Sequence, residues 1–462
     1  MFSKYYAGAA AAAAACTLAM TCLVSVPAWA KVSAEEAAKL GNQLTCQGAE
    51  KAGNAEGTIP EYSGKWLGKP SGLAYAGTGT PYTDPYADEK PLYVITASNM
   101  EQYAAKLTDG QKALLKKYPD TFNLPIYKTH RDWAYPQWIC DVSKKNAVTA
   151  ELVDDGLGIK ATNGSSPFPI PKSGLELVWN MTVPAASPRE VGTFDTAVVN
   201  PSGGISWARE FHKIVLSKAD PKNRVETTGS AAWSYGEKLV PQRDKGTLTY
   251  ARVPYNYKSD FLDVWQYSPG TRRVRQLPNY GFDQPGPGGY TTLDEGQIFN
   301  GSPERYNWKL IGKREIYVPY NTYKLLDPKL KYADLLKNKG HISPEYTRFE
   351  LHRVWVVEAE LKPGFRHLYP KRVMYIDEDT WVPLLGDNYD ARGQFWRTVM
   401  NHMVYAFDAQ TSWPHLAVYH DLVSGSYIAD RLTTEQKPVT LVDDGSLKEE
   451  QFSPDMLRGA GR

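Results

Sequence analysis

The chain has 462 residues, with 53 basic and 51 acidic side chains and a formal net charge of +2. This balance excludes the basic excess that is typical of nucleic-acid-binding proteins, so we expect no nucleic-acid partner. After residue 30, no apolar run reaches the ~20 residues that a membrane-spanning helix needs. The 30 Tyr and 13 Trp favour β-strands or a large apolar cavity, although an ordinary sheet core would account for many of them.

Residues 1–30 are typical of a cleaved signal peptide. Lys4 is the only charge before Lys31, a long apolar run follows it, and Ala28-Trp29-Ala30 matches a cleavage site. A membrane anchor is the alternative. The abundance of small residues and the lack of a charged stop-transfer segment favour cleavage. We therefore expect a soluble protein that is exported to the periplasm.

Four cysteines are present. Cys16 and Cys22 lie in the signal segment, and neither follows a Leu at the spacing of a lipidated signal, so we expect no lipid anchor. Cys46 and Cys140 remain after cleavage. An even pair in an exported protein favours a disulfide, with two unrelated buried thiols as the alternative. The cysteines exclude a zinc site made of thiolates.

The segment 31–200 reads as coil with short helices. A helix is expected over residues 33–41, irregular Gly/Pro-rich coil over 48–91, and a second helix over 98–118 that Pro119 stops. Because such coil cannot bury a core by itself, we expect residues 31–200 to pack on the rest of the chain. A Pro-rich connector at 163–174 is a plausible boundary.

Residues 201–462 are dominated by strands. Short connections favour antiparallel neighbours, and we expect roughly ten strands between residues 205 and 432, interrupted by a helix at about 329–339. The Ser268–Thr271 sequence SPGT predicts a tight hairpin turn. The candidate strands are 207–218, 247–255, 261–267, 272–277 and 347–361.

The run 347–361 alternates apolar and polar side chains, which predicts a strand with one buried face. Glu350 and His352 fall on its polar face, where we expect solvent. Pro383, within a later strand, indicates an edge or a bulge.

Five carboxylates lie in the stretch 375–397, and the question is whether they form a site or only turn the chain. Their spacing does not match a calcium loop. Asp and Gly are common in hairpin turns, so we interpret these carboxylates as residues of successive turns. They are Asp377, Glu378, Asp379, Asp387 and Asp390.

Several hairpins resemble those of periplasmic lipoprotein carriers of the LolA and LolB type. DVWQYSPGTRRVRQL and YIDEDTWVPLLGDNYDARGQFWR carry that likeness. Together with the stretches 300–321 and 346–372, they resemble a larger bacterial family, catalogued as domain of unknown function 1329 and labelled outer-membrane-lipoprotein-sorting-like. The resemblance extends from about residue 44 to residue 436.

The resemblance implies a mainly β (α+β) fold, a curved antiparallel sheet that forms an unclosed LolA/LolB-like half-barrel over residues 201–462. Helices would plug its open side, and the N-terminal segment would be an elaboration. It implies a monomeric periplasmic carrier for a lipid or other hydrophobic, acylated molecule. By context the family is also associated with inner-membrane transporters of the resistance–nodulation–division type. The alternative is an adaptor that bridges such a transporter and the outer membrane.

Six aromatic residues on the predicted strands are candidates for lining a ligand cavity, with ordinary core packing as the alternative for each. They are Trp265, Tyr267, Trp308, Tyr317, Trp355 and Trp396. A basic cluster is a candidate for contact with lipid headgroups or a partner, with a solvated strand face as the alternative: Arg272, Arg273 and Arg275. The Gly/Pro-rich loop 278–306 is a candidate lid.

An enzyme is not expected, and no catalytic residue, cofactor or metal centre is predicted. The chain has no H-E-x-x-H, G-x-S-x-G or Walker A motif. Glu350 and His352 share one strand face and, with a carboxylate from a neighbouring strand, would make a metal or acid–base site. The polar outer face of a sheet is the favoured interpretation.

Overall fold

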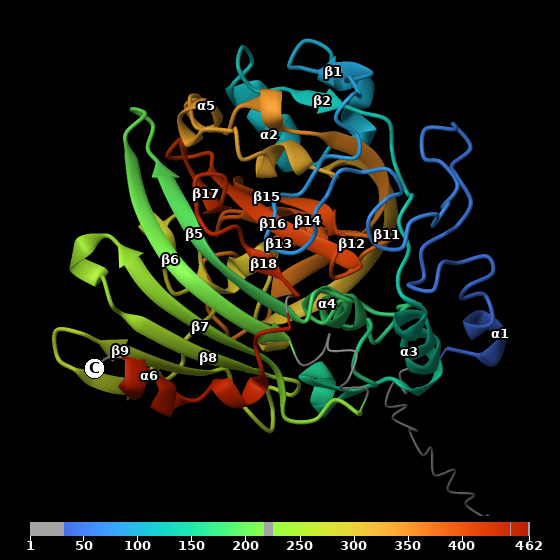
Figure 1. Cartoon of the computed structure of the whole chain (residues 1–462). Coiled ribbons are helices and arrows are strands. Elements are labelled where there is room, and N and C mark those ends of the chain that lie inside the picture. Colours follow the sequence, from blue (N-terminus) through green and yellow to red (C-terminus); the bar gives the residue numbers. More distant parts are fainter. Residues whose placement is uncertain (1–31, 217–224, 444, 461–462) are drawn as a thin grey trace, which may run out of the picture. The chain divides into compact units, whose positions relative to one another are not determined.

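The computed structural model describes residues 32–216, 225–443 and 445–460, and the expected signal peptide, residues 1–30, lies outside them. Residues 31–462 form one compact unit built on a large curved sheet that does not close (Figure 1). The prediction of a mainly β protein with an unclosed, curved sheet is confirmed, and the pairings of its described strands are antiparallel except for one parallel contact between Ile126 and Phe349. Within the described ranges, no helix combines the length and apolarity needed to cross a bilayer.

Sixteen strands of the described residues share this sheet, in the order β1-β2-β12-β13-β14-β15-β16-β17-β5-β6-β7-β8-β9-β10, with β11 beside β12 and β18 beside β5. A separate hairpin joins β3 (Glu151–Val153) and β4 (Gly158–Lys160). The strands of the large sheet are β1 (Tyr93–Ile95), β2 (Leu124–Ile126), β5 (Arg189–Val199), β6 (Ile205–Leu216), β7 (Ser230–Val240), β8 (Leu248–Pro254), β9 (Asp263–Ser268), β10 (Arg273–Gln276), β11 (Tyr306–Pro319), β12 (Phe349–Leu361), β13 (Lys371–Asp377), β14 (Pro383–Tyr389), β15 (Phe395–Ala406), β16 (Thr411–Asp421), β17 (Ser426–Leu432) and β18 (Leu441–Val442).

The connections within the sheet follow the turn chemistry of the sequence. The β9–β10 hairpin pairs Ser268 with Arg273, as the Pro-Gly turn predicts. Pro383 opens β14, and the β13–β14 register shifts beside it, which is the predicted bulge. The sheet is more than a simple meander, because β17 returns to pair with β5. β5 ends at Val199, so this central strand precedes the boundary that the sequence placed at residue 200.

The helices are short and lie around the sheet. The expected helix at 98–118 is two elements, a 3₁₀ helix (Met100–Lys106) and α2, because Thr108 forms a capping box with Gln111 and starts a new helix. The expected helix at 329–339 is a single turn, α5. The helices α3 and α4 were not predicted. The bounds are α1 (Ala34–Ala37), α2 (Asp109–Lys117), α3 (Gln137–Thr149), α4 (Gly174–Thr182), α5 (Tyr332–Leu335) and α6 (Pro454–Ala460).

Residues 59–139 of the N-terminal segment cover the outer face of β11–β15. Their buried Leu114, Leu115 and Trp133 join Val356 and Met400 of these strands in one core cluster. Residues 48–91 are largely irregular coil, as expected. The predicted disulfide between Cys46 and Cys140 is formed and ties the chain just before this coil to α3.

The opposite, inner face of β11–β17 is filled by the chain itself. Val357, Met374 and Tyr419 of the sheet pack there against α4 and against the segment 290–299. Both contacts are close. A Cβ on Gly174 of α4 would lie 2.4 Å from the carbonyl oxygen of Trp308, and one on Gly386 of β14 would lie 2.8 Å from the Ile298 side chain. We call β11–β17 the filled half of the sheet.

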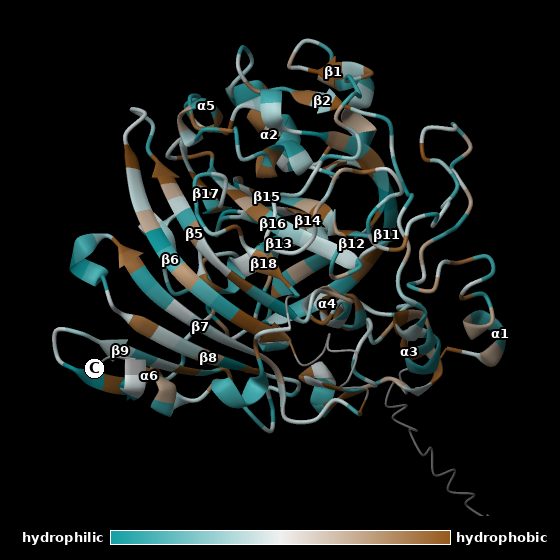
Figure 2. Ribbon diagram, viewed as in Figure 1, coloured by the Kyte–Doolittle hydropathy of each residue, from teal (hydrophilic) through white to brown (hydrophobic). Residues whose placement is uncertain are grey.

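Strands β5–β10 form the remaining part, the open half. Their outer face packs under α6 and the C-terminal segment, through residues such as Tyr235, Tyr250 and Leu457. Their inner face continues that of the filled half, because Val198 of β5 pairs with Ile428 of β17 and belongs to the same inner core. Figure 2 shows hydrophilic and hydrophobic residues mixed along β6 and its neighbours.

Candidate functional site

The six aromatic candidates for a cavity do not lie together. Trp308 and Trp355 border the inner core of the filled half, where Trp355 stacks on Trp381. Trp265 and Tyr267 lie on the outer face of the open half, below α6. Tyr317 belongs to the outer core beneath the N-terminal segment, and Trp396 donates from its indole to Asp421. Successive residues of a strand point to opposite faces of the sheet, so residues that were predicted to line one cavity lie on different faces.

The predicted basic cluster lies at the free edge of the sheet. Arg272, Arg273 and Arg275 are all exposed, in or beside the four-residue strand β10. Arg275 pairs with Gln266 and Arg273 with Ser268, which places both arginines on the inner side of β10. Charged residues on a short edge strand also prevent edge-to-edge pairing. The exposed position of the three arginines therefore fits both alternatives, contact with a headgroup or partner and a solvated strand face.

The loop 278–306, a candidate lid, divides into two parts. Residues 284–289 are largely exposed, whereas Asp294, Glu295 and Phe299 are at most 3% exposed. Asp294 pairs with Arg372 of β13 at 3.1 Å, and Glu295 accepts from the Asn388 amide of β14 at 2.7 Å. The second part is thus a fixed plug rather than a lid.

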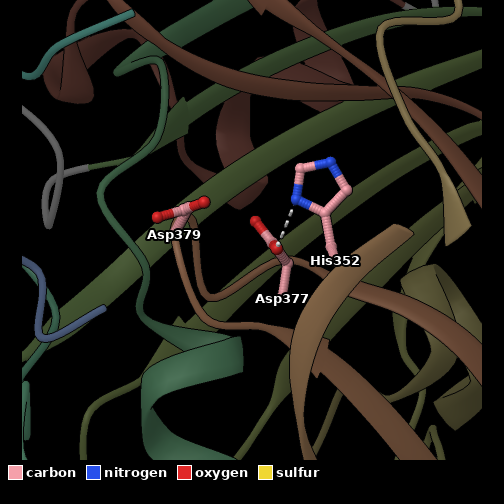
Figure 3. Close-up of side chains that lie close together, drawn as sticks. All are labelled: His352, Asp377 and Asp379. Atoms are coloured by element: carbon pink, nitrogen blue, oxygen red, sulfur yellow. Dashed lines mark ion pairs between the residues drawn. The ribbon is translucent and has the colours of Figure 1, made fainter. Parts of the chain in front are cut away.

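A buried polar cluster lies where β12 meets the β13–β14 turn. Glu350 and His352 are 0% and 1% exposed, so the predicted solvent-facing position of this strand face is wrong. Both faces of β12 are buried, because the N-terminal segment covers the face that carries these polar residues. Asp377, opposite Val354 in the register, brings its carboxylate to His352 (Figure 3).

The five carboxylates of the stretch 375–397 lie in three different environments. Asp390 accepts from the amides of Arg392 and Gln394 in an exposed turn, as predicted. Asp377 ends β13 and Glu378 and Asp379 lie in the turn that follows, but all three are at most 7% exposed. Asp387 lies within β14 instead, where it accepts from the Thr398 hydroxyl at 2.9 Å and from the Gly110 amide at 3.2 Å.

Electrostatics distinguish the members of the buried cluster. Burial would raise the pKa of Asp379, but Arg131, which donates to both of its oxygens at 2.7 Å, outweighs burial and lowers that pKa. Burial raises the pKa of Asp377, and the adjacent Asp379 raises it further. Burial also raises the pKa of Asp387, to about 7. These groups are closed to solvent, so the arrangement suits a bound cation or a held proton better than an open catalytic site.

The inner face of the open half carries a different pair. Glu210 and His212 of β6 lie 3.5 Å apart, and their side chains keep 35% and 31% of their surface exposed. Burial would lower the pKa of His212, but Glu210 outweighs it and raises that pKa. This pair was not predicted from the sequence. Its signal was the Glu-x-His spacing, which repeats that of Glu350 and His352.

Two surface hollows lie elsewhere, beside the N-terminal segment. One, of about 640 Å³, is lined by residues 65–67, 69–73 and Pro85. The other, of about 370 Å³, is lined by residues of 91–127 and 337–345. Neither contains a residue that the sequence predicted as cavity lining.

Comparison with solved structures gives distant likenesses. A DUF1329 family protein from Desulfovibrio piger aligns at a TM-score of 0.42 and 14% identity, covering 62% of this chain and 97% of that one. A LolA superfamily protein from Nitrosomonas europaea aligns at a TM-score of 0.36 and 13% identity, covering 62% of this chain and 100% of that one.

Sequence comparison is much closer. An uncharacterized protein of Pseudomonas aeruginosa is 41% identical over 445 residues, which are 95% of this chain and 96% of that protein. The family model described as "Protein of unknown function (DUF1329)" matches residues 94–458. The family suggested by the hairpin motifs is therefore confirmed, and this chain belongs to the DUF1329 family.

Proposed function

We propose that this protein is a non-enzymatic carrier that binds a lipid or other acylated molecule on the inner face of strands β6–β8. Carriage would take place in the periplasm, alongside an inner-membrane transporter of the resistance–nodulation–division type. The observation that carries the proposal is the contrast along one sheet face. The inner face is filled in one half of the sheet and remains partly exposed in the other.

The partly exposed inner face has the composition of a binding surface. Apart from Lys238, which lies opposite Glu210 in the register, the side chains of this face are small or apolar around one charged pair, and each is half-buried in the described structure. They are Ala208, Glu210, His212, Ile214, Ser234, Thr249, Ala251 and Val253. A concave sheet face of this kind can cover acyl chains, since each CH₂ removed from water contributes ~0.8 kcal/mol. Useful affinity then needs only a handful of chain carbons and no chemical step.

Polar groups at two positions would orient such a ligand. The Glu210–His212 pair lies within the face, and Arg273 and Arg275 lie on its inner side at the free edge. An acyl chain along β6–β8 would contact the inner face, and an anionic headgroup toward β10 would contact the arginines. Arginine suits this contact because its guanidinium binds phosphate and carboxylate in a bidentate manner.

The first experiment is mass spectrometry of what copurifies with the protein. The chain is expressed with its signal, collected without detergent and denatured, and the extracted small molecules are compared with a mock preparation. A stoichiometric lipid or other hydrophobe is the expected result. A chain that stays empty after incubation with native lipid extract would contradict the proposal.

A matched pair of variants in β6 locates the site. Ile214 lies half-buried on the inner face, whereas Ile205 is 36% exposed at the strand end. Ile214→Asp should abolish ligand recovery, because it places a charge against the acyl chain, and Ile205→Asp should leave it unchanged. Equal recovery from both variants would place the ligand elsewhere.

The adaptor is the second candidate, and one observation favours it. The chain's own α4 and residues 290–299 occupy the inner face of the filled half, so the surface available to a ligand is restricted to the open half. An adaptor would instead use the exposed edge at β10, with its three arginines. It predicts an empty chain that is retained by a transporter's periplasmic portion and released by the triple change of Arg272, Arg273 and Arg275 to Ala.

A further inference from the structure

One buried oxygen of the β12–β13 cluster has no partner. The Asp377 side chain is 0% exposed, and its Oδ1 has no hydrogen-bond partner among the described residues. The nearest ring nitrogen, Nδ1 of His352, lies 3.8 Å away, too far for a hydrogen bond. An unsatisfied buried carboxylate oxygen costs free energy, so something else is expected to occupy this position.

Charge pairing in the cluster leaves Asp377 without a cationic side chain in hydrogen-bond range, within the part of the chain that the structure describes. Each of the other three carboxylates has one: Glu350 has Arg348 at 2.6 Å, Glu378 has Lys313 at 2.7 Å and Asp379 has Arg131 at 2.7 Å. Asp377 Oδ2 accepts only from the hydroxyls of Tyr320 and Thr380. Arg353 also pairs with Glu378, at 3.3 Å, so the described cations of the cluster gather around the other carboxylates and none of them reaches Asp377 Oδ1.

His352 is oriented as a metal ligand would be. Its Nε2 lies 3.3 Å from Glu350 Oε2, and the Tyr320 ring stacks on the imidazole with centroids 3.8 Å apart. Because Glu350 is an acceptor held by Arg348, the imidazole proton belongs on Nε2. The lone pair of Nδ1 then faces Asp377 (Figure 3). A carboxylate behind the distal nitrogen is the usual second-shell arrangement of a metal-bound histidine.

We propose that His352, Asp377 and Asp379 form a site for one divalent cation of the Zn²⁺ class. One ligand atom from each residue lies within 4.8 Å of the others. Small side-chain rotations would bring the three atoms to the ~2.0–2.2 Å bond lengths of nitrogen and oxygen ligands. Asp379 can take part because each oxygen accepts one bond from Arg131 and keeps a further lone pair.

The role of this cation would be structural and separate from ligand carriage. The three residues are at most 7% exposed, so a substrate would not reach the ion, and a buried water would complete its tetrahedral coordination. The ion would tie β12 to the β13–β14 turn in the filled half. A bridging water, or a proton shared between His352 and Asp377, is the competing occupant.

Metal content of four proteins tests the proposal. Wild type, His352→Gln, Asp377→Asn and the control Asp390→Asn are purified without chelator, and bound metals are measured by inductively coupled plasma mass spectrometry. Wild type and the control should hold about one ion per chain, and the two site variants should lose it. After chelation, Zn²⁺ should raise the melting temperature of wild type and control only.

Asp377→Asn separates loss of the ion from loss of the fold. This change removes an unpaired buried charge, so the metal-free variant should melt at or above the temperature of chelated wild type. Co²⁺ gives an independent readout, because His and carboxylate ligation produces visible absorption that the two site variants should lack. Wild type that holds no metal, and shows no shift after refolding with Zn²⁺, would assign the position to water or a proton. Metal content that persists in Asp377→Asn would also overturn the proposal.

Discussion

The filled and open halves of the sheet share one continuous inner face but use it differently. In the filled half, large side chains such as Met374 and Tyr419 pack against α4 and residues 290–299. On β6–β8 of the open half, the same face carries mainly small or apolar half-buried residues, the Glu210–His212 pair and Lys238. One curved sheet can therefore be stabilised by core packing in one region and keep a partly exposed face for binding in another.

The two halves also differ in what covers their outer face. The filled half is covered there by the long N-terminal segment, which the Cys46–Cys140 disulfide ties down. The outer face of the open half is covered by the short C-terminal helix α6 and the residues before it, and near β5 by residues 325–342. The filled half is thus buried on both faces, and we expect it to unfold last.

The largest expected effect is loss of the disulfide. Replacing Cys46 and Cys140 by Ser removes a long-range cross-link and should cost about 4 kcal/mol of unfolding free energy. Hydrogen exchange should accelerate in β12–β15, beneath the N-terminal segment, and stay unchanged in β6–β8. Uniform acceleration across the sheet would show that the two halves are not independent.

Matched truncations on the inner face come next. Ile428→Ala in β17, a residue that is 1% exposed in the filled half, should cost about 3 kcal/mol in urea unfolding. Ile214→Ala in the open half should cost about 1 kcal/mol, since its side chain is already partly hydrated. Similar losses of unfolding free energy at the two positions would show that the two halves are equally buried on this face.

Asp387 gives the filled half a pH dependence. Its folded pKa, about 7, exceeds its ordinary value of 3.8, so the folded chain binds this proton more tightly. Its contribution is complete below the ordinary value and is lost as pH rises through about 7. Asp387→Asn should therefore stabilise the chain by roughly 2 kcal/mol at pH 8 and little at pH 4, as measured by chemical denaturation. A gain of equal size at both pH values would contradict this.

The smallest effect concerns the open half. Glu210→Gln removes the charge that raises the pKa of His212, so burial then dominates and that pKa should fall. NMR titration of the imidazole measures the change. Because the pair keeps contact with water, the melting temperature should hardly move.

Much of the fold could be predicted from local sequence. The alternation in 347–361, the Pro-Gly turn after Ser268 and the bulge at Pro383 all follow from backbone chemistry that neighbouring residues determine. The single turn of α5 and the division of the 98–118 helix could not be predicted, because packing and the Thr108 cap decide where those helices end. The pairing of β17 with β5 joins strands far apart in the chain, so no local sequence pattern predicts it.

The candidate sites were predicted less well, for one physical reason. Period two shows that Glu350 and His352 share a strand face, but it does not show what covers that face. The N-terminal segment covers it, which turns an expected solvent surface into a buried cluster with Asp377 and Asp379. The six aromatic candidates were separated by the same cause, since each strand face meets a different part of the chain.

The sequence by itself determined the β-rich class, the family, the hairpin turns and the cysteine pair, because these depend on residue type and short spacing. Only the tertiary structure decided which faces are buried, since burial depends on segments far apart in the chain. The N-terminal segment on the outer face and residues 290–299 on the inner face are such segments. They leave β6–β8 partly exposed and enclose one unpaired carboxylate oxygen, and these two features carry the proposals for carriage and for the cation.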